Sequence, residues 1–156
     1  MTTTQFTLQH HLPNQFDLVY STLLDFKKFG EVHPVITNVT IIKENLPDYI
    51  EYSIEEEIYL LGFIKNRPKY TAKVIEVEKH KHIRYTSPVK SFIFLTIDLT
   101  LTTGKNGLLQ VTETFEIKSN KVMGLVFKNI LSKAHLQFFK NLKKVLDNSV
   151  EDLVVN

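Results

Sequence analysis

The amino-acid sequence predicts an α+β fold in which a seven-stranded, curved antiparallel sheet wraps around one long C-terminal helix. Two patterns support this prediction. Over residues 121–146, which contain no proline, apolar residues recur at helical spacing. Over residues 35–118, apolar residues instead alternate with polar ones in runs separated by short turn sequences, which is typical of an antiparallel meander.

Size and composition restrict the class of protein. The chain has 156 residues, of which 43% are hydrophobic, and we expect a single domain spanning residues 1–156. The net charge of +2 is too small to indicate nucleic-acid binding. The absence of cysteine excludes disulfides and thiolate chemistry. The N-terminal segment lacks the regions of a signal peptide, and no apolar run approaches the ~20 residues that cross a membrane, so we expect a cytoplasmic protein.

One strand and two short helices are predicted at the start of the chain. Residues 3–9 alternate between apolar and polar, as a short strand does. Asn14 fits the N-cap of a first short helix. Asp25 can cap a second helix that continues through Gly30 and ends before Pro34. Two helices this small can close one end of a core but cannot form one alone.

Six further strands follow, each bounded by turn residues. The clearest alternation is at residues 49–61, where isoleucines share one face and glutamates the other. Asn106-Gly107 is the strongest short-range signal for a hairpin. We place turns at residues 46–48, 62–68, 80–82, 87–88 and 104–107. The predicted strands are residues 35–43, 49–61, 69–78, 83–87, 92–103 and 108–118.

The long helix carries one apolar stripe. At 100° per residue the stripe covers an arc of roughly 80°, with Ile130 on one flank and His135 and Leu146 on the other. The stripe faces protein, and the lysines of the helix face water. Its members are Phe127, Leu131, Ala134, Phe138, Leu142 and Val145.

Three apolar residues of this helix fall outside the stripe. Phe139, Leu136 and Leu125 lie toward the lysines, where they form either a self-association patch or ordinary scattered exposure. The tail, residues 147–156, has weaker helical character, and we expect fraying there.

This set of elements predicts an internal cavity. Seven strands at ~4.8 Å spacing span roughly 30 Å, whereas a helix with its side chains is only ~10–12 Å across. One helix cannot cover a flat sheet of that width, so the sheet must curl around it, as its natural twist permits. Where the curl is wider than the helix, a space lined by apolar side chains remains.

The order of elements and two local segments resemble a known superfamily. Leu23-Leu24-Asp25-Phe26, running on to His33-Pro34, is similar to its segment between the small helices and the second strand, and residues 111–115 are similar to its last strand. The chain thus resembles the START-like superfamily, also called SRPBCC or helix-grip. That superfamily includes lipid and sterol carriers, plant allergen-like binders, polyketide cyclases and chaperone co-activators. The resemblance implies a cavity beneath the long helix.

Two carboxylates interrupt the apolar faces of predicted strands. Glu56 follows Ile54, and Glu113 lies between Val111 and Phe115. An unpaired carboxylate in an apolar cavity has a raised pKa and can bind a ligand hydroxyl or move a proton. The alternative is that each lies near a strand end or bulge, paired with a lysine, an arginine or a tyrosine.

Three further side chains could present polar atoms to the cavity. His135, at the edge of the helix stripe, could direct a ring nitrogen into it, or could simply pack at its rim. Tyr52 and Tyr85 could offer hydroxyls, although packing alone also explains tyrosines in half-buried strands. The residues expected to line the cavity are Tyr52, Ile54, Glu56, Tyr85, Leu95, Ile97, Val111, Glu113, Phe127, Leu131, His135 and Phe138.

The sequence contains no arrangement typical of metal, cofactor or nucleophile chemistry. His80 and His82 lie in a lysine-rich turn without a third ligand, and His10 and His11 alternate along a strand. No phosphate-binding loop, dinucleotide fingerprint or serine nucleophile elbow is found. We therefore expect no metal and no cofactor.

Three functions fit these observations. The first is binding or carriage of a small hydrophobic molecule, such as a lipid or a polyketide, in the cavity. The second is an enzyme of the cyclase or dehydratase type, in which a glutamate, histidine or tyrosine of the same cavity moves protons next to a carbonyl. The third is an interaction protein that acts through its surface, as chaperone co-activators of the superfamily do. Catalytic residues are not assigned.

Overall fold

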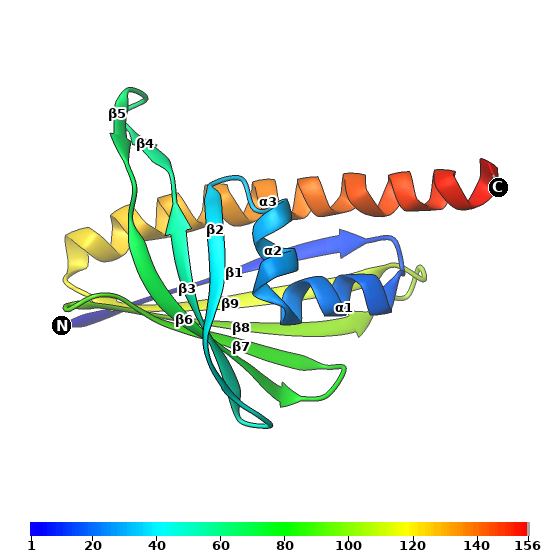
Figure 1. Cartoon of the computed structure of the whole chain (residues 1–156), viewed down its shortest axis with the longest axis horizontal. Coiled ribbons are helices and arrows are strands. Elements are labelled where there is room, and N and C mark those ends of the chain that lie inside the picture. Colours follow the sequence, from blue (N-terminus) through cyan, green and yellow to red (C-terminus); the bar gives the residue numbers. More distant parts are fainter. Residues whose placement is uncertain (156) are drawn as a thin grey trace.

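The structure is a computed structural model that describes the backbone of residues 1–155 and the side chains of residues 1–150 other than residue 60. A curved sheet, two short helices and one long helix make up the fold (Figure 1). The elements are β1 (Thr2–Leu12), α1 (Phe16–Leu24), α2 (Phe26–Val32), β2 (Ile36–Asn45), β3 (Tyr49–Glu56), β4 (Ile58–Leu60), β5 (Ile64–Asn66), β6 (Lys69–Glu78), β7 (His82–Lys90), β8 (Ile93–Thr103), β9 (Leu109–Ser119) and α3 (Lys121–Val155).

Seven of the strands form one antiparallel sheet in the order β1-β9-β8-β7-β6-β3-β2. From β2 to β9, each strand of this sheet pairs with the strand that follows it in the sheet along the chain. β1 completes the sheet by pairing along the whole of β9. The sheet bends around α3, and α1 and α2 lie together at one end of it (Figure 1). The predicted α+β fold is confirmed.

The side chains that face α3 from the sheet form the core. On β9 the alternation is complete, because Leu109, Val111, Phe115 and Ile117 are all fully buried. Burying each such side chain contributes roughly 2 kcal/mol relative to exposure. Two polar residues share this face and are equally buried, Glu113 in its middle and Ser119 at its end.

The buried face of α3 differs from the predicted stripe. Phe138, Phe139, Leu142 and Leu146 are buried around His135, so the face is centred on His135, about 60° around the helix from the predicted centre. Phe139 is only 4% exposed, and the expectation that it lies among the lysines was wrong. Val145, placed in the stripe by the sequence, is 43% exposed. The first half of the helix borders a cavity, whereas the second half, with Phe138, Phe139, Leu142 and Leu146, packs on the core.

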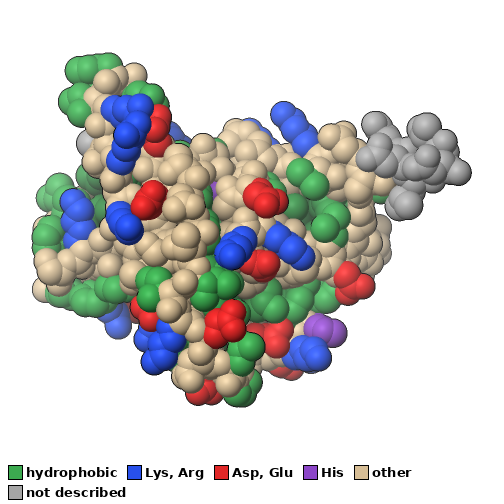
Figure 2. Space-filling model, in the orientation of Figure 1, with side chains coloured by type: hydrophobic (Ala, Val, Ile, Leu, Met, Phe, Trp, Pro, Cys, Tyr) green, Lys and Arg blue, Asp and Glu red, His purple; other side chains and the backbone are tan. Residues whose placement is uncertain are grey.

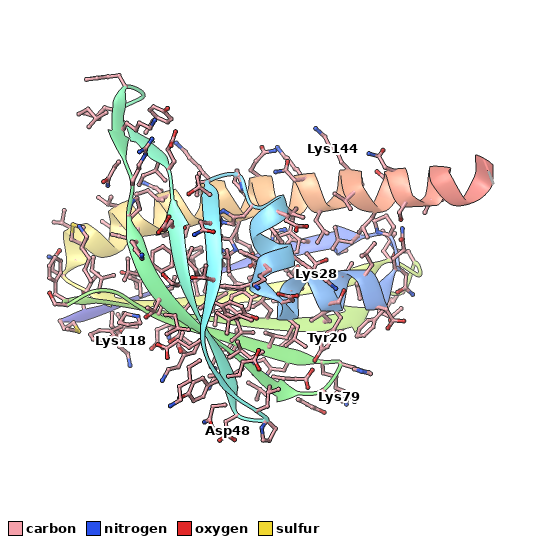
Figure 3. All side chains as sticks on the ribbon, viewed as in Figure 1. Tyr20, Lys28, Asp48, Lys79, Lys118 and Lys144 are labelled. Carbon is pink, nitrogen blue, oxygen red and sulfur yellow. The ribbon has the colours of Figure 1, made fainter. Side chains whose placement is uncertain are left out.

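The helix begins at a polar cap and approaches the sheet closely. Asn120 Oδ1 accepts a hydrogen bond from the Met123 backbone N–H at 2.9 Å. A Cβ on Gly124 would lie 2.4 Å from Thr4 Oγ1, so glycine permits the contact between α3 and β1. Lys144 points away from the sheet (Figure 3). The helix runs to Val155 and so continues past residue 146, where the sequence indicated weaker helical character and fraying.

No helix within the described backbone is long and apolar enough to span a membrane.

The two short helices have different caps. Asp25 accepts from the Lys27 N–H at 2.9 Å and caps α2 as predicted, although that helix extends to Val32. For α1 the predicted cap, Asn14, was wrong, because Gln15 occupies the position. The Gln15 amide instead donates to the Leu146 carbonyl at 2.9 Å, which ties the start of α1 to α3.

The predicted strand at residues 49–61 is divided in two. Pairing of β3 with β6 ends at Glu55, and the chain then leaves the sheet to form the separate β4–β5 hairpin. This hairpin projects beyond α3 (Figure 1), where the sequence predicted only a break. Hydrophobic side chains gather at its tip, with basic and acidic groups just below (Figure 2). The exposed apolar residues are Tyr59, Leu61, Phe63 and Ile64.

The predicted turn at Ser87-Pro88 was also wrong. β7 continues to Lys90, and Pro88 pairs with Phe94 of β8 next to a bulge. Pairing of β7 with its other neighbour, β6, stops at Thr86. Pro88 therefore lies where β7 is an edge strand, and its missing N–H leaves no ladder bond unmade.

Candidate ligand-binding site

A cavity of about 1150 Å³ lies between α3 and the curved sheet. Its walls come from α2 and the chain that leads from it into β2, from β3 and β6–β8, and from the first half of α3. Exposed residues such as Tyr59, Lys90 and Gln137 form its rim. Most of the wall is apolar. The principal apolar residues are Phe26, Phe29, Ile36, Ala72, Leu95, Ile97, Phe127, Ile130 and Leu131.

Behind one wall of the cavity, Glu113 joins two histidines. Nδ1 of His135 on α3 lies 2.7 Å from one carboxylate oxygen, and Nε2 of His10 on β1 lies 2.8 Å from the other. Burial raises the pKa of Glu113, but the facing His135 and His10 outweigh burial and bring that pKa below its ordinary value. Glu113 is therefore ionised at neutral pH and accepts from both rings.

This arrangement fixes both rings. His10 also stacks on Phe139 at a centroid distance of 3.6 Å, and His135 meets Phe115 edge-on at 5.0 Å. Because the two carboxylate oxygens are directly hydrogen-bonded, the cluster leaves no gap for a metal ion between its members.

The second ring nitrogen of His135 faces the cavity. His135 Nδ1 carries the proton that it donates to Glu113, and Nε2 has no hydrogen-bond partner among the described residues. In the described part of the chain, no side-chain nitrogen or oxygen that is shut off from solvent lacks a hydrogen-bond partner. Because Nε2 of His135 lacks such a partner, this atom must be accessible. His135 is only 4% exposed and lines the cavity, so that access is through the cavity.

His33, at the end of α2, lies beside His135 in the same wall. The two ring centroids are 5.9 Å apart at 82°. His33 Nδ1 accepts from the Val35 N–H at 3.4 Å, which leaves the ring proton on Nε2. Burial against the aromatic wall, and then the positive charge that His135 can carry, lower the pKa of His33 to about 3. His33 is thus neutral at physiological pH.

Elsewhere in the cavity wall, Glu56 of β3 is paired with Tyr70 of β6. The Tyr70 hydroxyl donates to Glu56 Oε1, and both residues line the cavity. Burial raises the pKa of Glu56, while the Tyr70 hydrogen bond acts in the opposite direction. The other wall hydroxyls are already used, because Tyr85 donates to the Leu23 carbonyl and Ser87 to the Thr71 carbonyl.

The structure brings together seven of the twelve residues predicted to line the cavity. Those seven are Glu56, Tyr85, Leu95, Ile97, Phe127, Leu131 and His135. The other five do not reach its surface: Tyr52, Ile54, Val111 and Phe138 are packed in the core, and Glu113 lies behind His135. Contact of any of the twelve with a ligand stays a prediction.

Three residues of the site were not identified from the sequence. His10 shares the inward face of β1 with Phe6, Leu8 and Leu12, so the alternation of that strand could have identified it as buried. Tyr70 belongs to a strand with weak alternation, and His33 lies between elements, where neither periodicity gives a signal.

By sequence, the chain matches no family model and no curated protein. Similar solved structures do exist. The di-domain aromatase/cyclase StfQ of the steffimycin biosynthetic pathway has a TM-score of 0.78 at 10% identity over 96% of this chain and 52% of its own. This chain thus spans about half the length of StfQ.

Two other solved structures match over nearly their whole length. The Zhui aromatase/cyclase from Streptomyces sp. R1128 has a TM-score of 0.76 at 11% identity, covering 96% of each chain. Ara h 8.0201 has a TM-score of 0.71 at 12% identity, covering 94% of this chain and 99% of its own. Identities this low establish the fold alone. The chain therefore has the helix-grip fold, and the resemblance to the START-like superfamily is confirmed at the level of the fold.

Proposed function

We propose that this protein binds a small hydrophobic molecule in the cavity between α3 and the sheet. The observation that carries the proposal is the cavity itself, which has a volume of about 1150 Å³ and a mainly apolar wall with a few polar groups. At about 25 cal/mol per Å², a ligand that buries roughly 300 Å² of apolar surface gains about 7.5 kcal/mol before the costs of association. A lipid or a polyketide-like molecule has this chemistry.

Titration with N-phenyl-1-naphthylamine, a neutral fluorescent probe, tests the proposal. Phe127 lines the cavity from α3, and Leu125 lies on the same helix but is 54% exposed and outside the cavity wall. Phe127→Glu places a charge in the apolar wall and should weaken probe binding at least tenfold. Leu125→Glu adds the same charge outside and should leave the affinity within twofold. Equal affinities for the two variants, or no saturable binding by the natural protein, would count against a ligand cavity.

A second candidate function is acid–base catalysis in the same cavity. It is favoured by the Glu113–His135 pair, in which an ionised carboxylate holds Nδ1 and leaves Nε2 open to the cavity. Nε2 could take a proton from a carbon next to a carbonyl, so that the C–H electron pair forms an enolate while Glu113 offsets the charge of the imidazolium. StfQ and Zhui are aromatase/cyclases of this fold.

Deuterium exchange separates this candidate from simple binding. We expect the protein to accelerate exchange of the protons next to the carbonyl of 1-tetralone in D₂O, followed by NMR. Glu113→Gln should remove the acceleration, and Glu116→Gln, on the opposite face of β9, should keep it. If the natural protein binds the ketone without accelerating exchange, the catalytic candidate fails and the binding function stands.

A further inference from the structure

We propose that the polar end of the ligand is a weakly acidic hydroxyl group, a phenol or an enol, held between the rings of His135 and His33. This inference rests on the proposed binding function and specifies its ligand. The inference follows from the hydrogen bonds of the two rings. In each ring Nδ1 is bonded to another protein group, and Nε2 has no partner among the described residues.

His135 supplies the acceptor. Its Nδ1–H is donated to Glu113 at 2.7 Å, so the neutral ring presents a lone pair at Nε2. The position of the ring is fixed because Glu113 is itself held by His10 at 2.8 Å.

His33 supplies the donor. Its Nδ1 accepts from the Val35 N–H, so its proton is on Nε2. The ring is confined by Phe29 at 5.3 Å and Phe138 at 6.1 Å between centroids. The two histidines thus offer one acceptor and one donor from the same wall.

One oxygen atom would bridge the two rings. The ring centroids are 5.9 Å apart, and two hydrogen bonds of about 2.8 Å require the two Nε2 atoms to lie within about 5.6 Å of each other. A hydroxyl oxygen would donate to His135 Nε2 and accept from His33 Nε2–H, so that both nitrogens and the hydroxyl are satisfied.

An acidic hydroxyl fits this site better than other polar groups. If the proton moves along the O–H···N bond to His135, the imidazolium is neutralised by Glu113 and the oxygen anion accepts from His33. Both positions of the proton are therefore stabilised. An ether offers no proton to Nε2, and a carboxylate would place a second negative charge near Glu113 unless His135 is already protonated. The aromatic rings of the wall, including Phe29 and Phe127, suit a flat, ring-bearing ligand.

Three naphthalenes of one shape test the assignment by calorimetric titration: 1-naphthol, 1-methoxynaphthalene and 1-naphthoate. We expect 1-naphthol to bind at least tenfold more tightly than the methyl ether, and 1-naphthoate to bind most weakly. The absorbance of bound 1-naphthol should also show ionisation at a lower pH than that of the free phenol.

Two variants locate the preference. His33→Phe keeps an aromatic ring but removes the donor, and should reduce the preference for the phenol over the ether to less than threefold while leaving ether binding within twofold. His11→Phe, on the exposed face of β1, is the matched control and should keep the full preference.

Each alternative outcome has a distinct meaning. If phenol and ether bind equally, the hydroxyl assignment is wrong and the binding function stands. If 1-naphthoate binds most tightly, the site takes an anion and the assignment is again wrong. If none of the three binds and N-phenyl-1-naphthylamine also fails to bind, the proposed function itself is overturned.

Discussion

Nδ1 of His135 lies 2.7 Å from Oε1 of Glu113, and this contact joins the centre of the buried face of α3 to the middle of β9. A carboxylate with no exposure is normally a cost to folding, and here two imidazole N–H groups offset that cost. The same contact orients the open nitrogen of His135 toward the cavity. Stability and the candidate site therefore depend on one buried group.

Replacing that group should destabilise the fold. In Glu113→Gln the amide offers one acceptor and one donor where two acceptors are needed, so one histidine N–H loses its partner. We expect a loss of about 1–3 kcal/mol in the free energy of unfolding, measured in urea. Glu116→Gln, on the solvent face of the same strand, should change it by less than about 0.5 kcal/mol. Equal effects of the two substitutions would show that Glu113 does not organise the core.

His33 should make stability depend on pH. Its pKa falls from 6.5 to about 3 on folding, because of burial and the neighbouring His135, so between these values the unfolded chain binds more protons. Stability should therefore fall as the pH is lowered from about 6.5 toward 3, by up to about 1.4 kcal/mol per pH unit from this one group.

The variant His33→Phe removes this contribution. Urea unfolding at several pH values between 5 and 7 should show a smaller slope for His33→Phe than for the natural protein, and His11→Phe serves as the control for loss of a histidine. An unchanged slope in His33→Phe would mean that His33 is not held neutral in the folded state.

The hydrogen bond from Tyr70 should lower the pKa of Glu56. Burial raises the pKa of this carboxyl, and the Tyr70 hydroxyl counteracts burial. Tyr70→Phe should therefore raise the pKa of Glu56 further, as followed by carbon-13 NMR of the glutamate carboxyls. A pKa that stays the same or falls in Tyr70→Phe would rule out the pair as described.

Phe139 tests the orientation of α3. It is 4% exposed and stacks on His10, whereas Leu136, one turn earlier, is 46% exposed. Phe139→Ala should cost about 3–5 kcal/mol in the free energy of unfolding. Leu136→Ala should cost less than about 0.5 kcal/mol. A larger loss for Leu136→Ala than for Phe139→Ala would contradict this orientation of α3.

The comparison of sequence and structure shows where each kind of reasoning succeeds. Strands β8 and β9 are predictable because the apolar residues of one face are buried or line the cavity, and because the turn at Asn106-Gly107 is unambiguous. The β4–β5 hairpin is not predictable in this way, because it leaves the sheet. Its apolar residues are exposed, so their spacing does not indicate a buried face. At Pro88 the expectation that proline ends a strand failed, because the pairing of β7 with β6 had already ended at Thr86.

The candidate site follows the same division. Glu113 and His135 could be singled out because a polar residue interrupts or borders an apolar face. The contact between these two residues could not be predicted, because it depends on how α3 is rotated about its axis over the sheet, which helical periodicity alone does not fix. His33 lies between two elements, and only the tertiary structure brings it to His135.

Native mass spectrometry of the protein isolated from its own host tests the ligand-binding proposal most directly. We expect a reproducible additional mass that is lost on denaturation, or uptake of one apolar molecule per chain from a panel of lipids and aromatic polyketide-like compounds. A mass equal to that of the chain alone, with no uptake from such a panel, would contradict the proposal that the cavity between α3 and the sheet holds a ligand.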